Sequence, residues 1–320
     1  MPKTLLLIAW FTASSLVLAT THLAVVSASA TNQRNGFNLE GALIPVAEIL
    51  PGGPAKDGIP AIDNPQFLPP ESKPSLEESD MVLGINYNGI AKAYPIRIMN
   101  WHEIVNDRFK DDYIAVTFCP LCDSGMAFLA MIEKNRLEFG VSGLLYNSDV
   151  LLYDRSTNSL WSQLMMTAVS GPYRGTKLEQ IVVEHTTWLD WHNNYPDTLV
   201  LSFDTGYQRD YKRDPYAGYQ LSNQTFFPVQ YDAKRFHPKQ LVIGLEINGS
   251  ARAWPFNELS KSSGPVEDFI GSTPLSISYD PQHNSAVIKD ASGNTLPATT
   301  LFWFAWSAFH PTSEVYLFKP

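Results

Sequence analysis

The residues best suited to chemistry are Cys119 and Cys122, which are the only two cysteines of the 320-residue chain. Their Cys-Pro-Leu-Cys spacing lets both sulfurs bind one metal ion, or cycle between a dithiol and a disulfide. A disulfide that closes so short a loop would stabilise the fold by only about 2 kcal/mol in the chain-entropy account. We therefore expect these thiols to have a chemical role rather than to act as a structural staple.

A metal site needs more ligands, and two residues near the motif in the sequence can supply them. His102 lies before the strand expected to carry the cysteines, and Met126 lies four residues after Cys122. Two thiolates, an imidazole and a thioether form a soft set that suits copper, whereas the set without Met126 suits zinc. The sequence thus predicts a copper or zinc site formed by Cys119, Cys122, His102 and Met126.

Two other classes of function remain open. In a thiol-dependent enzyme, Cys119 or Cys122 would exchange disulfides or act as a nucleophile with His102 as its base. Residues 123–125 and an expected strand follow the motif, however, whereas a thioredoxin-like motif begins a helix. In a non-catalytic recognition module, aromatic and acidic loops, including residues 207–219, would hold a glycan or a protein. The longer segment 207–227 is expected to be a functional or packing loop. Only recognition would survive replacement of both cysteines.

Further polar residues are candidates to line a pocket close to the thiols. Some follow the cysteine strands within an apolar frame, and the helix expected before those strands adds a carboxylate. The candidate pocket residues are Glu103, Tyr146, Asn147, Asp149, Asp280 and His283. Asp154, by contrast, opens a polar run typical of a hairpin turn, for which we expect a structural role.

An internal duplication organises the chain. Residues 82–95 read VLGINYNGIAKAYP and residues 242–255 read VIGLEINGSARAWP, so that valine, glycine, asparagine, alanine and proline recur at matching places. In both copies strand-forming residues flank Asn-Gly, a pair typical of hairpin turns because both residues tolerate positive φ. Each half is therefore expected to open with a β-hairpin.

The duplication extends more weakly to the cysteine motif. Alignment of AVTFCPLCDSGMAF with LSISYDPQHNSAVI places Cys119 over Asp280 and Cys122 over His283. One interpretation is that the second copy kept the turn and lost its chemistry. The other is that both turns face one shared site, to which Asp280 and His283 contribute.

The remaining pattern indicates a mainly β protein with a few short helices, that is, a β-rich α+β fold of duplicated, hairpin-led halves. Strands are expected at residues 114–118, 126–132, 137–141, 150–153 and 199–203, and helices at residues 97–109 and 188–194. We expect an extended arm or linker at residues 31–79, a first half with the cysteine site at 80–235, and a shorter pseudo-repeat packed on it at 236–320.

The N-terminus has the layout of a secretory signal peptide. Lys3 precedes an apolar run, and the small residues Ala28-Ser29-Ala30 favour cleavage after Ala30. Loss of residues 1–30 would give a secreted or periplasmic protein without an integral membrane span; a retained N-terminal anchor is the alternative. The formal charge of −9 argues against nucleic acid as a partner. The expected partner is a small molecule, a glycan or a protein.

Several sequence blocks, in order, carry a family resemblance. They read AKAYPIRIMNWHEIVND, FCPLCDSGMAF, GLLYNSDVLLYDRSTNSLWSQL, TTWLDWHNNYPDT and FWFAWSAFHP. Together they resemble the bacterial and archaeal domain of unknown function 3179 (DUF3179) family over nearly all of the chain beyond Gly36. The resemblance implies an extracytoplasmic setting but no particular reaction, so the site residues named above rest on their own chemistry.

Overall fold

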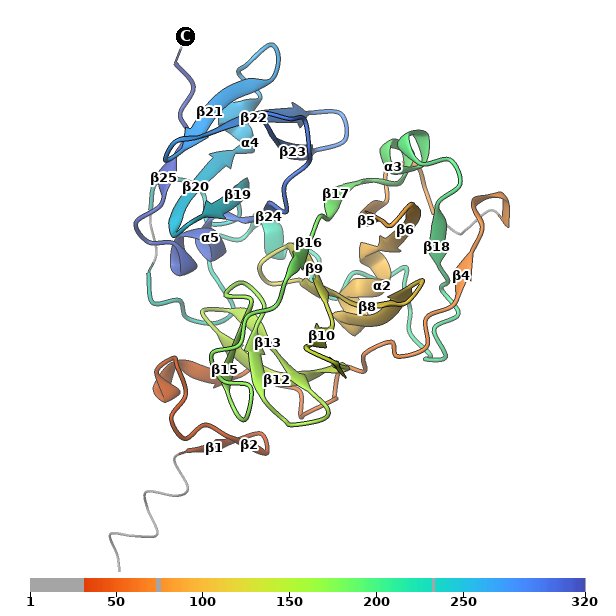
Figure 1. Cartoon of the computed structure of the whole chain (residues 1–320), viewed down its shortest axis with the longest axis vertical. Helices are drawn as coiled ribbons and strands as arrows, with labels where there is room; N and C mark the ends of the chain where they lie inside the picture. Colours follow the sequence, from red (N-terminus) through yellow and green to blue (C-terminus); the bar gives the residue numbers. More distant parts are fainter. Residues whose placement is uncertain (1–31, 73–75, 232–233, 320) are drawn as a thin grey trace, which may run out of the picture.

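The protein is built from small β-sheets arranged like a five-bladed propeller, as the computed structural model in Figure 1 shows. The structure describes residues 32–72, 76–231 and 234–319, so the expected signal peptide at residues 1–30 lies outside the described residues. The mainly β class is confirmed. Within the described ranges, no helix has the length and apolar character needed to cross a membrane.

Blades 1 and 2 come from the first half of the chain, with blade 1 on the right of Figure 1. Their strand orders are β17-β5-β6-β18-β4 and β16-β9-β8-β7. The strands are β4 (Phe67–Leu68), β5 (Met81–Tyr87), β6 (Ile90–Pro95), β7 (Ile104–Phe109), β8 (Asp112–Cys119), β9 (Ser124–Leu129), β16 (Gln180–Ile181), β17 (Glu184–Thr187) and β18 (Leu199–Leu201). Helix α2 (Ile96–His102) connects the two blades, and α3 (Trp188–Asn194) joins β17 to β18.

Blade 3, at the bottom of Figure 1, receives one strand from the N-terminal arm. Its order is β15-β14-β13-β12-β3, with β3 (Ile49–Pro51), β12 (Phe139–Tyr146), β13 (Asp149–Asp154), β14 (Leu160–Ser162) and β15 (Thr167–Ser170). Two small hairpins and a 3₁₀ turn flank these strands in the sequence: β1 (Gln33–Arg34), β2 (Phe37–Asn38), β10 (Met131–Ile132), β11 (Asn135–Arg136) and η1 (Val46–Glu48). A second 3₁₀ turn, η2 (Pro70–Ser72), follows β4 of blade 1. Phe37 and Leu39 are buried against blade 3, so the arm packs on it.

Blades 4 and 5 form the second half, with blade 5 at the top of Figure 1. Their orders are β24-β19-β20-β25 and β21-β22-β23. The elements are β19 (Leu241–Ile247), β20 (Ser250–Pro255), α4 (Phe256–Leu259), β21 (Val266–Ile270), β22 (Thr273–Asp280), β23 (Ser285–Asp290), β24 (Thr299–Phe302), α5 (Trp303–Phe309) and β25 (Glu314–Val315). A long connection from blade 1, which contains η3 (Tyr219–Leu221), leads into this half.

The expected duplication is confirmed, and it extends further than the two hairpins. The order β5-β6-α2-β7-β8-β9 recurs as β19-β20-α4-β21-β22-β23, and β17-α3-β18 recurs as β24-α5-β25. In each half the late strand pairs antiparallel with the first hairpin strand, and the last strand pairs parallel with the second. Blade 3 is inserted only in the first half, between β9 and β17.

Both Asn-Gly pairs make the turns predicted from the sequence. Asn88 and Gly89 have φ values of 50° and 77°, and Asn248 and Gly249 have values of 51° and 79°. The strands on either side pair in register from Val82 to its partner Pro95, and equivalently in the second half. The Asn-Gly pairs therefore correctly predict the hairpin at the beginning of each half.

In each half, a tryptophan of α3 or α5 packs directly on a glycine of the first hairpin strand, β5 or β19. A Cβ atom added at Gly84 would lie 2.2 Å from the ring of Trp191, and one added at Gly244 would lie 2.2 Å from the ring of Trp306. Each indole N–H then donates to a hydroxyl seven residues later, at 2.8 and 2.9 Å. Only glycine allows this approach, so the packing explains why the motif contains it.

The helix expected at residues 97–109 is correct only in its first part. Helix α2 ends at His102, because Glu103 adopts a left-handed conformation with φ of 59°. The next residues form β7, which pairs antiparallel with β8. The apolar residues of this segment fit both a helical and a strand period, and the sheet partner decides between them.

Candidate metal centre

Both cysteines lie in the tight turn between β8 and β9. Cys119 is the last residue of β8, and the backbone N–H of Cys122 donates to the Cys119 carbonyl at 3.1 Å. Asp123 has a positive φ of 52°, which turns the chain back so that Ser124 pairs with Cys119. The cysteines are 1% and 0% exposed and form no disulfide. Two free, buried thiols therefore share one turn.

A second hairpin, from blade 3, brings a carboxylate to the thiols. Asn147 and Ser148 form the turn between β12 and β13, with φ of 51° and 64°, as a two-residue hairpin requires. The Ser148 carbonyl accepts hydrogen bonds from the thiols of Cys119 and Cys122, at 3.7 and 3.4 Å. One carboxylate oxygen of Asp149 and the two sulfurs all lie within 4.8 Å of one another. Two blades thus supply three potential metal ligands.

The carboxylate of Asp149 is only partly satisfied. Its Oδ2 accepts the backbone N–H of Leu164 at 3.1 Å, whereas its buried Oδ1 has no hydrogen-bond partner within the described residues. Burial raises the pKa of Asp149 to about 7, against the opposing effect of N–H groups from Leu164 and Val150 and of the thiols. An unpaired oxygen in a buried acid is costly, and a bound cation would remove that cost.

Glu103 adds a second buried acid next to this group. Its side chain lines the same cavity as Cys119, and it is positioned there by the left-handed end of α2. Burial, together with the smaller effect of the nearby charge of Asp149, raises the pKa of Glu103 to about 8. Glu103 is not part of the described group of ligand atoms, so as placed it is a candidate proton acceptor beside the thiols, and it would have to move to become a fourth ligand.

Burial also raises the pKa of both thiols. For Cys119, burial outweighs the opposing hydrogen bond from Cys122; for Cys122, the neighbouring Cys119 adds to the effect of burial. The positive charge of the Lys239 amine opposes the shift at Cys122. Without a metal ion, both cysteines are consequently thiols rather than reactive thiolates at neutral pH.

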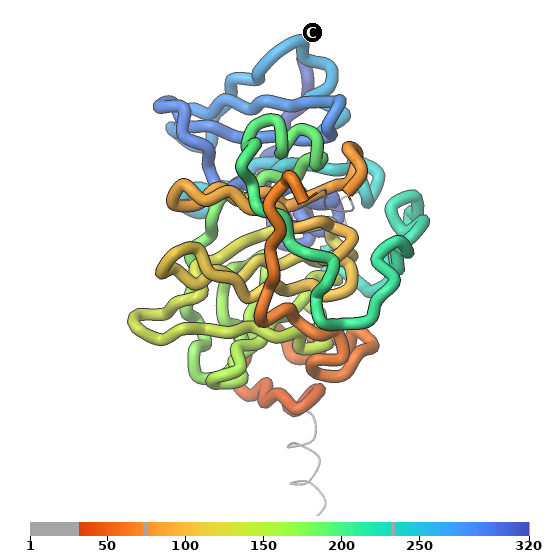
Figure 2. The backbone as a smooth tube through the Cα atoms, turned by 90° about the vertical axis from the view of Figure 1, so that its right-hand side faces the viewer, coloured from red at the N-terminus to blue at the C-terminus, as the bar shows by residue number. Residues whose placement is uncertain are grey.

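A cavity of about 260 Å³ opens beside Cys119 and Glu103. One wall comes from blade 3, and another comes from Tyr216, Phe226 and Phe227 of the connection between blades 1 and 4. Figure 2 shows this connection, coloured green to teal, running along one side of the molecule. The sequence predicted the segment 207–227 as a functional or packing loop, and its aromatic residues do line the candidate site.

Two residues near the thiols were not anticipated. Tyr219 lies within electrostatic reach of both cysteines, and its buried hydroxyl has no partner among the residues described. The amine of Lys239 lies over the Tyr219 ring, 4.1 Å from its centroid, and donates to the Gln224 carbonyl at 3.0 Å. The density of tyrosines in the loop was the only sequence signal for this contact.

The structure does not place His102 with the sulfurs. Its Nδ1 bonds to the carbonyl of Pro60 at 2.8 Å, and its Nε2 bonds to the hydroxyl of Tyr211 at 2.6 Å. Burial lowers the pKa of His102. Both ring nitrogens are therefore engaged in joining α2 to the N-terminal arm and to the aromatic loop, and the described ligand group does not include this residue.

Three further candidates make other contacts. The side chain of Met126 is buried and lines a different cavity, together with His310. Tyr146 packs edge-on against Phe309, with ring centroids 5.6 Å apart. Asn147 accepts the backbone N–H of Gln230 through its side chain at 2.8 Å. Asp154, as expected, caps its own turn by accepting from Thr157 and Ser156.

Asp280 and His283 form a separate group with Asp190 of α3. Their ligand atoms lie within 4.8 Å of one another, and His283 Nδ1 is 2.6 Å from the Thr187 hydroxyl. The turn between β22 and β23 thus contacts the start of α3. The cysteine turn contacts the start of α5 in the equivalent way, because Phe302 donates its N–H to the Cys122 carbonyl at 2.8 Å. The two turns are matched in position, and each has its own polar group.

The comparisons with known proteins give a family and no activity. No curated protein and no solved structure matches the chain closely enough to serve as a relative. The family described as "protein of unknown function (DUF3179)" matches residues 56–313, a span that contains both cysteines, Asp149 and Glu103. Because this match covers most of the chain, and because the motif blocks lie within it in order, the protein belongs to the DUF3179 family.

Proposed function

We propose that the protein binds a transition metal ion through Cys119, Cys122 and Asp149. The observation that carries this proposal is the convergence of two buried thiols with a buried carboxylate oxygen that lacks a hydrogen-bond partner. Removing several acids from water without a matching cation is unfavourable, and the amine of Lys239 is the one positive charge that acts on Cys122 within the described part of the chain. A divalent ion would replace the thiol protons and compensate the charge.

Zinc fits these donors better than copper does. The sequence favoured copper marginally because Met126 and His102 would have made the ligand set soft. The geometry supports Asp149 instead, and zinc binds thiolates and carboxylates together, whereas copper(I) prefers sulfur and imidazole. Three protein ligands also leave a fourth position, for Glu103 or for a molecule in the adjacent cavity. We therefore favour a zinc site with access to a substrate or to another zinc ligand.

The cellular setting remains part of the proposal. The signal-peptide layout of residues 1–30 favours export, and the protein would then take up its metal in the periplasm or outside the cell. An N-terminal sequence of the exported protein that begins at Thr31 would support this setting. A mature protein that retains Met1 would support the anchored alternative.

The first test is the metal content of the exported protein, purified without chelators. We expect close to one equivalent of zinc, and its loss from the Cys119→Ser/Cys122→Ser variant. The matched control is Asp280→Ala/His283→Ala, which changes the equivalent turn of the other half and should retain the metal. Competition between zinc and copper(I) for the metal-free protein then ranks the two ions.

The outcome that contradicts the proposal is equally clear. If neither zinc nor copper binds after full reduction and reconstitution, the thiols are not a metal site. Equal loss of metal from the control variant would mean that the change acts through folding. Circular dichroism of all three proteins separates that case.

A thiol redox role is the second candidate, and one observation favours it. The two thiols lie close enough for a hydrogen bond between them to affect both pKa values. A disulfide between them would release two protons and two electrons to an oxidant. A protein that carries no metal but forms this disulfide reversibly would support the redox role, although the raised thiol pKa values would make it slow.

A further inference from the structure

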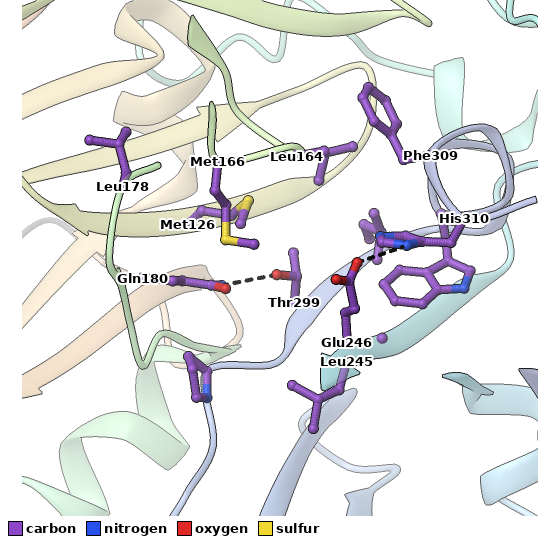
Figure 3. Close-up of a pocket in the computed structure, with 14 residues that line it drawn as sticks. Met126, Leu164, Met166, Leu178, Gln180, Leu245, Glu246, Thr299, Phe309 and His310 are labelled. Carbon is purple, nitrogen blue, oxygen red and sulfur yellow. Dashed lines mark hydrogen bonds and ion pairs between the residues drawn. The ribbon is translucent and has the colours of Figure 1, made fainter. Parts of the chain in front are cut away.

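A second cavity, of about 280 Å³, lies between blade 4 and segments of blades 2 and 3 (Figure 3). Figure 3 shows Met126, Leu164, Met166 and Leu178 near the hydrogen-bonded Gln180 and Thr299, and a polar pair, Glu246 and His310, on the other side. The apolar residues that line it include Met126, Leu164, Met166, Leu178, Leu301 and Phe309. The cavity is separate from the one beside Cys119, although the backbone N–H of Leu164 bonds to Asp149.

The polar pair consists of Glu246 on β19 and His310 at the end of α5. His310 Nδ1 lies 3.5 Å from a carboxylate oxygen of Glu246. The imidazole stacks on the Trp306 ring, with centroids 4.0 Å apart, and its backbone N–H donates to the Trp306 carbonyl at 2.8 Å. His310 is thus held in place, and Glu246 is the only carboxylate among the residues that line the cavity, which include no lysine or arginine.

The equivalent corner of the first half is built differently. The matching positions of Glu246, His310 and Thr299 are occupied by Asn86, Tyr195 and Glu184, according to the pairing of β17 with β5 and of β24 with β19. The Tyr195 ring lies 4.1 Å from the Trp191 ring, and its hydroxyl donates to Glu184 at 3.4 Å. In the first half, a large side chain spans this corner.

This difference is informative because the surrounding packing is the same. Both halves keep the glycine under a tryptophan and the hydroxyl that accepts from its indole. In the second half the corner has a smaller imidazole and its carboxylate, Glu246, lines a cavity, whereas the carboxylate of the first-half corner, Glu184, accepts from Tyr195. Glu246 and His310 are therefore replaced by other residue types, Asn86 and Tyr195, in the first half, as expected for a ligand-binding feature added to a shared scaffold.

We propose that this cavity binds a small organic amine in its ammonium form. The ammonium group would donate to Glu246, whose carboxylate also faces His310, and the apolar body would contact the leucine and methionine side chains. A volume of about 280 Å³ accommodates on the order of ten heavy atoms, because a liquid water molecule takes about 30 Å³. The formal charge of −9 on the whole chain also favours cations over anions.

The test uses three probes that share one ring and differ in charge: benzylamine, benzyl alcohol and benzoate. Each is titrated into the full exported protein and followed by calorimetry and by tryptophan fluorescence, since Trp306 lines the cavity. We expect benzylamine to bind at least about tenfold more tightly than the alcohol, as a charge-assisted hydrogen bond implies. Benzoate should not bind.

Two variants assign the binding to this cavity. Glu246→Gln should weaken benzylamine at least about tenfold, whereas Glu267→Gln, which removes the same charge from an exposed position on β21, should not change it. Glu246→Asn/His310→Tyr copies the residues of the first half and should abolish binding. Thermal unfolding confirms that each variant is folded.

Some outcomes would overturn the proposal. Equal affinity for benzylamine and benzyl alcohol, or an unchanged affinity in Glu246→Gln, would show that the carboxylate does not recognise the ligand. Failure of benzylamine, phenethylamine and butylamine alike at millimolar concentration would reject an amine site. The Cys119→Ser/Cys122→Ser variant should still bind benzylamine, so this result does not depend on the metal site.

Discussion

The two halves of this protein share a scaffold and differ where that scaffold presents polar groups. The ion pair Lys92–Asp107 in the first half has its counterpart in Arg252–Asp268 in the second. A tyrosine hydroxyl in the first half and an indole N–H in the second donate to these same aspartates. The polar contacts between β6 and β7 in the first half are therefore retained between β20 and β21 in the second.

The two halves differ at the turns between β8 and β9 and between β22 and β23. The first half has two fully buried thiols at the β8–β9 turn, and the second has the half-buried Asp280 and His283 at the β22–β23 turn. Asp280 accepts the N–H of Gln282 at 2.8 Å, whereas Oδ1 of Asp149 accepts nothing from the described residues. A satisfied polar turn needs no ligand, whereas a buried oxygen without a partner is costly, and this contrast is why we propose the metal site at the first turn.

The largest effect should come from breaking the packing that both halves share. Trp191→Ala and Trp306→Ala each remove an indole that lies over a glycine, and each should lower the free energy of unfolding by about 3–5 kcal/mol. Chemical denaturation measures both values. If one of the two substitutions is neutral, the glycine–tryptophan contact is not an equivalent support in the two halves.

The retained ion pairs should differ in strength. Lys92 and Asp107 have side chains only 8% and 5% exposed, so Lys92→Met should destabilise by about 3 kcal/mol by leaving a buried charge. Arg252 and Asp268 are 21% and 14% exposed, and Arg252→Met should have a smaller effect of about 1 kcal/mol. Denaturation midpoints of the two variants test this order, and a reversed order would refute the argument from burial.

The turns themselves can be compared through their aspartates. Asp149→Asn should weaken zinc at least about a hundredfold, because a neutral amide replaces a charged ligand. Asp190→Asn makes the same change beside the second turn and should leave zinc affinity unaltered. Competition with a chelating dye measures both affinities. A comparable loss of zinc affinity in both variants would contradict a zinc site at the first turn alone.

Much of the fold could be predicted from local signals. The Asn-Gly pairs fixed both hairpins, and helix α3 begins and ends at the residues expected from its apolar spacing and the proline after it. The propeller-like arrangement could not be predicted in the same way. It depends on the insertion of blade 3 between β9 and β17, and on strands that pair across more than half of the first repeat.

The candidate site was predicted in part, for a similar reason. Residue type and spacing identify the cysteines as candidates. Asp149 is a candidate because it lies in a run rich in polar residues within an apolar frame. His102 and Glu103 are adjacent, yet only Glu103 lines the thiol cavity, because the left-handed residue at the end of α2 redirects the chain. The approach of Asp190 to Asp280 joins residues far apart in the sequence. Periodicity carries no information about either arrangement.

The smallest expected effect concerns pH at the corner where Tyr195 and His310 correspond. Burial lowers the pKa of His310, against the charge of Glu246, so the imidazole is neutral near pH 7 and becomes charged only below its ordinary value of 6.5. A charged imidazole would neutralise Glu246 and repel an ammonium ion. Benzylamine affinity should therefore be constant from about pH 8 to 7 and fall several-fold at more acidic pH.

The control for this pH effect is His310→Gln, which keeps a polar group but cannot become charged. Glu246 and His310 are the only titratable residues that line the cavity, so the variant should bind benzylamine with little dependence on pH over the same range. If the variant shows the same pH dependence as the unmodified protein, the titrating group is not His310. If the affinity of His310→Gln for benzylamine is the same at every pH, and Glu246→Asn/His310→Tyr does not bind, then His310 and Glu246 form a cation site. The equivalent residues of the first half would have only a structural role.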